Sequence, residues 1–115
     1  MTDKTIFSRI IDGELPGTFV YQDDVVVAIR DLKPAAPVHV LVIPRKPIPS
    51  LQHLDENDVE LAGRMLLAAS RIAEQEGLED GYRLIVNTGP NGGQTVPHLH
   101  LHILGGRKMT ERMVP

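Results

Sequence analysis

The sequence predicts an α+β fold: a five-stranded antiparallel sheet with one long helix and a short N-terminal helix. Five short segments rich in β-branched or alternating apolar residues are separated by turn residues, and a single long segment has the periodicity of an amphipathic helix. A doubly wound parallel sheet needs a crossover helix between successive strands, and this chain has too few helices to supply them.

The first half of the chain supplies the short helix and three of the strands. Residues 5–12 place four apolar side chains at helical spacing, and Gly13 follows as a stop signal. Extended segments are predicted at residues 18–22, 25–30 and 38–43. A loop with three prolines ends the third of them.

The long helix begins near Asp55, which can cap it with Asp58 at the third position, and Gly77 is its predicted end. Its apolar side chains between residues 59 and 73 cover an arc of about 180°, whereas a one-sided helix needs only about 100°. The helix therefore either contacts a second surface, such as another subunit, or lies deep in one core. Strands at residues 82–87 and 98–104 complete the sheet.

Composition limits the class of protein. A chain of 115 residues, 42% of them hydrophobic, predicts a single domain over residues 1–115 with its own core. The absence of cysteine excludes disulfides and thiol chemistry. A net charge of −3 disfavours a nucleic-acid partner. No apolar stretch is long enough for a membrane span and no secretory signal is visible, so we expect a cytoplasmic protein.

The strongest functional signal is a row of three histidines at a spacing of two: His98, His100 and His102. Alternate residues of a strand share a face, so three imidazoles are expected on one face and three apolar side chains on the other. Such a strand gives groups that titrate near neutral pH a rigid support. A solvated face carrying histidines by chance is the weaker interpretation.

Two chemistries compete for this row. Two histidines at this spacing can bind zinc, with the third completing an open site. Catalytic zinc sites usually have carboxylates that orient the imidazoles, and residues 87–104 contain no Asp or Glu. This favours nucleophilic and acid–base catalysis at phosphorus, although carboxylates from elsewhere in the chain remain available to zinc.

A glycine-rich loop at residues 88–95 precedes the histidines. Glycines let backbone N–H groups approach a ligand closely, and these groups together with the Thr95 hydroxyl can bind phosphate oxygens without a cation. A plain turn between two strands is the alternative for Asn91–Gly92. The position of the loop beside the histidine row favours a phosphate site.

Residues 98–104 match the signature His-φ-His-φ-His-φ-φ, where φ is apolar, at every position. The chain resembles the histidine triad family, and its Hint branch in particular, through nearly its whole length. Further matching stretches are residues 6–11, 31–34, 36–44, 82–87, 92–95 and 105–107.

This resemblance implies a homodimer in which two sheets join into one of ten strands through the long helix and the edge strand before the triad. It also implies hydrolysis of the P–N bond of adenosine 5′-phosphoramidates, with no required metal or cofactor. His100 would attack the α-phosphorus and carry a transient nucleotidyl group. His98 and His102 would bind phosphate oxygens and help move protons to the leaving amine.

The resemblance also implies a purine nucleotide site. The residues expected to contact phosphate or ribose are Asn87, Gly93, Gln94 and Thr95. Asp31 would accept hydrogen bonds from the ribose hydroxyls, unless it is only a turn residue that closes a strand. The side chains expected in the base pocket, or alternatively in the plain core, are Ile6, Phe7, Ile10, Ile29 and Leu32.

The sequence departs from the family pattern in the loop after the third strand. Many relatives have a fourth histidine there, and Pro47 occupies this position, with His53 six residues on. This departure keeps open a nucleotide-binding module with little turnover. His39, on the third strand among apolar neighbours, is predicted to be a structural histidine.

Overall fold

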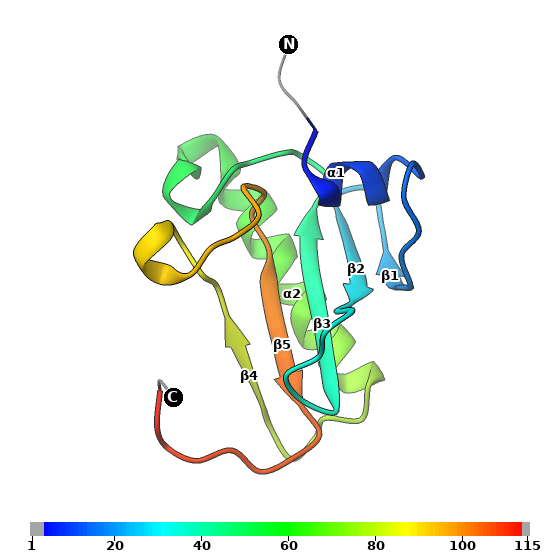
Figure 1. Ribbon diagram of the computed structural model, residues 1–115, viewed down its shortest axis with the longest axis vertical. Helices are drawn as coiled ribbons and strands as arrows, with labels where there is room; N and C mark the ends of the chain where they lie inside the picture. Colours follow the sequence, from blue (N-terminus) through cyan, green and yellow to red (C-terminus); the bar gives the residue numbers. More distant parts are fainter. Residues whose placement is uncertain (1–3, 114–115) are drawn as a thin grey trace.

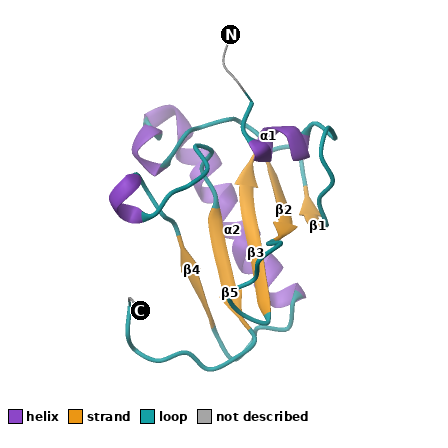
Figure 2. Cartoon of the chain, viewed as in Figure 1, coloured by secondary structure: helices purple, strands orange, loops and turns teal. Residues whose placement is uncertain are grey.

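The computed structural model describes residues 4–113 and contains one five-stranded antiparallel sheet, as the sequence predicts (Figures 1 and 2). The strand order is β1-β2-β3-β5-β4, so β1 and β4 form the edges. The strand bounds are β1 Phe19–Gln22, β2 Val26–Arg30, β3 Val38–Pro44, β4 Tyr82–Ile85 and β5 Leu101–Gly105.

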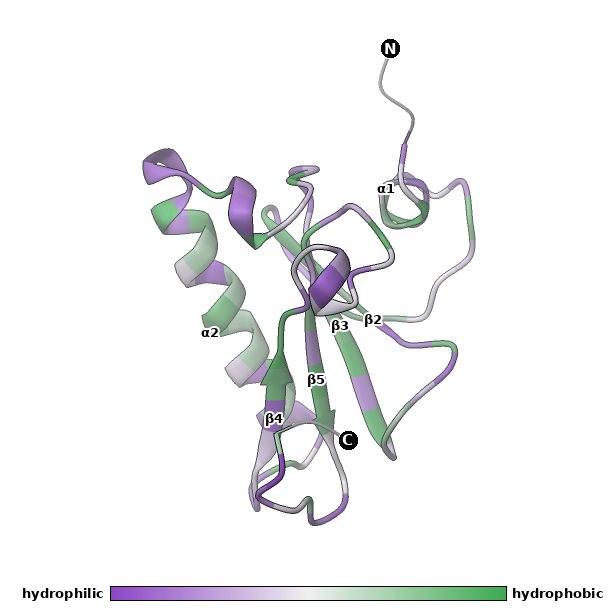
Figure 3. Cartoon of the chain, turned by 60° about the vertical axis from the view of Figure 1, so that its left-hand side comes forward, coloured by the Kyte–Doolittle hydropathy of each residue, from purple (hydrophilic) through white to green (hydrophobic). Residues whose placement is uncertain are grey.

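Two helices lie on opposite faces of the sheet: α1, Ile6–Ile11, and α2, Val59–Gln75 (Figure 3). Short 3₁₀ turns occupy the loops: η1 Leu51–His53, η2 Glu56–Asp58 and η3 Pro90–Gly92. In residues 4–113, no helix combines the length and the apolar composition that crossing a bilayer requires.

Strict alternation along the central strands divides the core into two clusters. In β3, Val40 and Val42 belong to the cluster under α2, whereas Leu41 and Ile43 belong to the cluster on the α1 side. Because side chains of a strand point alternately to opposite faces, a nearly continuous apolar strand supplies both clusters.

The start of the long helix follows the predicted capping pattern. The Asp55 carboxylate accepts from the Asn57 N–H at 2.8 Å, and the Asp58 carboxylate accepts from the Asp55 N–H at 3.1 Å. This capping box begins η2, which runs directly into α2. After the helix, Gly77 has a φ of +75°, the left-handed conformation expected of a C-terminal stop.

The apolar arc of α2 is only partly buried by its own sheet. Met65, Ala69 and Ile72 are buried against the strands. Leu66 and Leu67 remain 55% and 56% exposed, so the alternative of a helix deeply buried in one core is wrong for this chain.

The last strand begins later than predicted. The regular strand β5 starts at Leu101, so His98 and His100 lie before it and not within it. The backbone N–H of Leu99 bonds to the carbonyl of Ile48, in the loop after β3, instead of continuing the ladder. Leu99 still packs in the α2-side cluster with Leu101, so the predicted division of faces persists beyond the strand.

Candidate active site

The central imidazole of the triad, His100, is held by a backbone carbonyl. Its Nδ1 lies 2.7 Å from the carbonyl oxygen of His98. Since a carbonyl can only accept, Nδ1 must donate, and the neutral ring keeps its lone pair on Nε2. The rings of Phe7 and His100 meet edge to face at a centroid distance of 4.9 Å, and this contact further limits the motion of the imidazole.

The first histidine of the triad is fully buried, and both of its ring nitrogens have partners. His98 Nε2 donates to the carbonyl of Pro44 at 2.9 Å. Its Nδ1 lies 3.0 Å from the Thr5 hydroxyl and 3.3 Å from the Ser8 hydroxyl. Burial lowers the pKa of His98 below its ordinary value of 6.5, so the ring is neutral at pH 7. Both ring nitrogens of His98 are thus occupied by partners within the protein.

The third histidine of the triad contacts a residue that the sequence did not assign to the site. The Ala35 N–H donates to His39 Nδ1 at 3.0 Å, so His39 Nε2 carries the hydrogen. That Nε2 donates to His102 Nδ1 at 2.9 Å, and the remaining hydrogen of the neutral His102 ring is therefore on its Nε2. The two strands β3 and β5 thus fix the tautomer of His102.

The electrostatics keep His102 neutral. Burial, followed by the nearby His100 and His39, lowers the pKa of His102 from 6.5 to about 4, against the opposing effect of Asp31. The His100 and His102 rings meet nearly edge to face, with centroids 4.9 Å apart. At neutral pH, His102 can therefore offer a hydrogen bond from Nε2 without bringing a positive charge next to His100.

His39 joins the triad because of the strand order. β3 pairs with β5, and Leu41 lies opposite His102, so His39 is a diagonal neighbour of His102 on the same face. A fourth imidazole does reach the triad, from β3 and not from the loop that carries Pro47. Knowledge of the β3–β5 pairing would have revealed this contact, but no local pattern supplies it.

Asp31 lies at the end of β2, beside His39. One carboxylate oxygen accepts from the Lys33 N–H at 2.7 Å, which is the turn role that the sequence offered as an alternative. The other oxygen lies 3.5 Å from His39 Nε2 and so faces the histidines. Asp31 thus closes the strand and also contributes a negative charge to the site.

The predicted phosphate loop is braced by two amide side chains, Asn87 just before it and Gln94 within it. Asn87 Nδ2 donates to the carbonyl of Gly92 at 2.8 Å. Gln94 accepts from the Gly89 N–H at 3.0 Å and donates to the carbonyl of Pro49 at 2.7 Å. Gly93 has a φ of +79°, which favours glycine, and Thr95 is exposed.

The five predicted base-pocket residues divide into two groups. Phe7, Ile10 and Ile29 belong to the buried cluster on the α1 side of the sheet, as plain core residues would. Ile6 is 50% exposed and Leu32 is 89% exposed. Of these five residues, only Ile6 and Leu32 offer extensive apolar surface to a ligand.

The zinc alternative has a definite location. Asp31, His39 and His102 each offer one ligand atom, and these atoms lie within 4.8 Å of one another. The donor set suits zinc, but the 2.9 Å separation of His39 Nε2 and His102 Nδ1 is that of a hydrogen bond with one shared proton. A metal ion would have to displace that proton and separate the two rings.

Comparison with known proteins decides the family, because the family model named "HIT domain" matches residues 12–109. The chain belongs to the HIT family. This HIT chain is 52% identical over 110 residues to the purine nucleoside phosphoramidase of Escherichia coli K12, covering 95% of this chain and 92% of that protein. It is 49% identical over 107 residues to a 14 kDa zinc-binding protein of Zea mays, covering 91% and 84%.

The fold of this HIT chain is also that of solved relatives. A HIT family hydrolase from Clostridium thermocellum superposes with a TM-score of 0.95 at 43% identity, over 99% of this chain and all of that one. The predicted family and fold class are thereby confirmed, and the protein is a hydrolase of the HIT family.

Proposed function

We propose that this HIT hydrolase binds a purine nucleotide and cleaves the P–N bond of adenosine 5′-phosphoramidates, with His100 as the nucleophile. The observation that carries this proposal is the 2.7 Å hydrogen bond from His100 Nδ1 to the His98 carbonyl, which leaves the lone pair on Nε2. The identity to a purine nucleoside phosphoramidase supports the choice of substrate class.

In the first step, His100 Nε2 forms a bond to the α-phosphorus while the bond from phosphorus to the amine nitrogen breaks. The positive charge that develops on the imidazole is stabilised by the His98 carbonyl through Nδ1–H. The leaving nitrogen takes a proton from solvent water as it departs. A second water then attacks phosphorus and breaks the bond to His100 Nε2; its proton returns to solvent, AMP is released and His100 is again neutral.

His102 is placed to act on the oxygens and on the leaving group. Its Nε2–H can donate to a phosphate oxygen or to the departing nitrogen, since Nδ1 already accepts from His39. His98 has a different task from the one that the family resemblance implied, because both of its ring nitrogens are bonded within the protein. We assign His98 to orientation of His100 rather than to phosphate binding.

The nucleotide would lie between the braced loop and the end of β2. Backbone N–H groups around Gly93 and the hydroxyl of Thr95 would contact the phosphate, and Asn87 and Gln94 would hold the loop in shape. The Asp31 oxygen not bonded to Lys33 would accept from the ribose hydroxyls, and Ile6 and Leu32 would contact the base.

The test is AMP release from adenosine 5′-phosphoramidate by the wild type and by His100→Ala, each with and without a chelator. We expect chelator-resistant turnover that falls by about 10⁴-fold or more in the variant, as for other essential nucleophiles. His53→Ala is the matched control, because His53 is an exposed histidine whose Nδ1 lies 2.8 Å from the Ser50 hydroxyl, in the loop after β3.

A second candidate function, zinc binding, rests on the cluster of Asp31, His39 and His102. It predicts stoichiometric metal after purification and activity that the chelator removes. A wild type that binds AMP but releases none from the phosphoramidate would instead be a nucleotide-binding module with little turnover.

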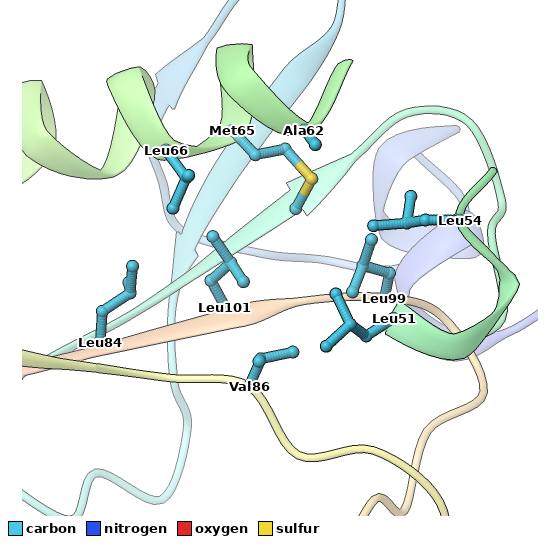
Figure 4. A pocket seen from close by; sticks show the side chains of 9 residues that line it. All are labelled: Leu51, Leu54, Ala62, Met65, Leu66, Leu84, Val86, Leu99 and Leu101. Carbon is cyan, nitrogen blue, oxygen red and sulfur yellow. The ribbon is translucent and has the colours of Figure 1, made fainter. Parts of the chain in front are cut away.

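We also propose a homodimer through α2 and the edge strand β4. Leu66 of α2 and Leu84 of β4 are both exposed and lie on either side of an apolar cavity of about 190 Å³ (Figure 4). Exposed apolar patches of this kind on a folded domain mark interaction surfaces, and an unpaired edge strand can extend the sheet into a second subunit.

Light scattering on the purified protein tests this assembly. We expect twice the 12.7 kDa mass of a single chain, and a shift to the single-chain mass for Leu66→Asp. Leu15→Asp, which changes a partly exposed leucine in the loop after α1, should leave the mass unchanged. A wild type with the mass of one chain would exclude the dimer.

A further inference from the structure

The short helix α1 is linked to the triad by hydroxyl groups. Thr5 is the N-cap of α1, and its Oγ1 accepts from the Ser8 N–H at 3.1 Å. The same oxygen lies 3.0 Å from His98 Nδ1, and the Ser8 hydroxyl lies 3.3 Å from that nitrogen. A single hydroxyl thus caps the start of a helix and contacts a buried histidine that is 93 positions away in the sequence.

The direction of these hydrogen bonds follows from the partner on the other side of the ring. Because the Pro44 carbonyl takes the hydrogen of His98 Nε2, a neutral His98 has only a lone pair at Nδ1. That lone pair needs a donor, and His98 is fully buried, so water has no access to it. The hydroxyls of Thr5 and Ser8 are the groups that can donate to this nitrogen. They also lie 3.3 Å from each other, so Thr5 donates either to Nδ1 directly or to Ser8, whose own hydrogen then goes to Nδ1.

His98 in turn determines the state of His100. The carbonyl of residue 98 accepts from His100 Nδ1 and so leaves the Nε2 lone pair available for attack. If His98 changed its tautomer, it would lose the bond to Pro44, and the ring and its peptide would have to move. A displacement of this carbonyl would release the nucleophile from its single fixed tautomer.

We infer that Thr5 and Ser8 are positioning residues of this hydrolase: their hydroxyl hydrogens hold His98 in the Nε2–H tautomer, and His98 holds His100. This inference rests on the proposed function, because its kinetic consequence is measured with the same reaction. It adds a task for α1 beyond the packing of Phe7 and Ile10 on the sheet.

The alternative is that Thr5 matters only as a helix cap. Thr5→Asp combined with Ser8→Ala separates the two roles. An aspartate still accepts from the residue 8 N–H and is among the best N-cap residues, but its ionised carboxylate has no hydrogen to donate to His98. A carboxylate there favours a hydrogen on Nδ1, which is the opposite of the state in the wild type.

The experiment compares this double variant with the wild type, with Thr5→Ser and with Thr18→Val, an exposed threonine outside the site. Imidazole ¹⁵N NMR of the nucleotide-free protein reports the tautomer of each histidine, and steady-state kinetics report kcat and KM. We expect Thr5→Ser and Thr18→Val to behave as the wild type. The double variant should fold and should carry a hydrogen on His98 Nδ1. Its kcat should fall by about 10- to 100-fold with little change in KM.

Unchanged His98 NMR signals in the double variant would overturn the inference, and so would an unchanged kcat with altered NMR signals. If the wild type releases no AMP, the proposed function fails, and the NMR comparison alone still decides whether the hydroxyls set the state of His98 and His100. A loss of activity in Thr5→Ser as large as that in the double variant would also contradict the inference, because Thr5→Ser retains the hydroxyl.

Discussion

The two faces of the sheet differ in their covering, although the same strands build both. On one face, β5 directs Leu101 and Ile103 into an apolar cluster that the 17-residue helix α2 covers. On the other face, α1 has only six residues and buries just Phe7 and Ile10, and the histidines lie along β5 and the segment that leads into it, with His102 within the strand and His98 and His100 before it.

This difference shows how a period of two allows one strand to serve both stability and chemistry. Burial of apolar side chains under α2 supplies the larger part of the core, whereas the imidazoles are rigid because each is bonded to a strand or loop. Neighbouring residues of β5 should therefore respond to substitution in opposite ways.

The sharpest test of the comparison is a pair of adjacent substitutions in β5. Ile103→Ala removes a fully buried side chain on the α2 face and should lower the free energy of unfolding by about 2–5 kcal/mol, with little change in kcat of the folded protein. His102→Ala should lower kcat by about 10²- to 10⁴-fold and destabilise the protein less. Urea unfolding and AMP release measure both quantities, and equal effects of the two variants would refute the division of faces.

A smaller effect is expected at His39, which meets the triad through His102 and lies 3.5 Å from Asp31. His39→Gln removes the imidazole whose Nε2–H fixes the His102 tautomer, and we expect kcat to fall by about 10- to 100-fold. Affinity for AMP, measured by calorimetry, should change little. His53→Gln serves as the control, and a wild-type kcat in His39→Gln would show that His102 needs no such partner.

The mildest effect concerns pH. The pKa of His102 is lowered from 6.5 to about 4, and burial also lowers the pKa values of His98 and His39. Between pH 6.5 and about 4 the unfolded chain binds more protons than the folded chain, because its histidines have the higher pKa. The stability that the neutral histidines contribute is therefore complete above pH 6.5 and is lost as the pH falls towards 4. The slope of the free energy of unfolding against pH in this range therefore reflects the histidine face and not the α2 face.

Urea unfolding at a series of pH values from 7.5 to about 4.5 measures the slope. We expect a shallower slope in His102→Gln, because one group with a lowered pKa is removed. A free energy of unfolding that is constant over this range in the wild type would contradict the prediction.

The elements of the fold could be predicted because their signals are local. The apolar period of residues 59–73, the capping pair Asp55 and Asp58 and the stop at Gly77 all act within a few residues, and each lies where predicted. The start of β5 could not be placed, because the N–H of Leu99 bonds to Ile48, far away in the sequence.

Contacts between residues far apart in the sequence also explain why His39 and the donors to His98 could not be predicted. The triad is visible as a local pattern, but His39 meets it only through the β3–β5 pairing, and the donors to His98 come from α1. The roles of Asn87 and Gln94 also depend on distant partners, such as the Gln94 bond to Pro49. Strand order and loop-to-loop contacts are not encoded in any short window of sequence.

The bond between Thr5 and His98 has a consequence for how the protein is made. It joins residues 93 positions apart, so this contact can form only after all of residues 5–98 have been synthesised and α1 has met the segment before β5. A chain in which this contact has not yet formed can bury apolar residues, but its His98 lacks the donors that hold it. Full hydrolytic activity would thus require the finished fold, and its appearance during refolding would mark the joining of α1 to the segment before β5.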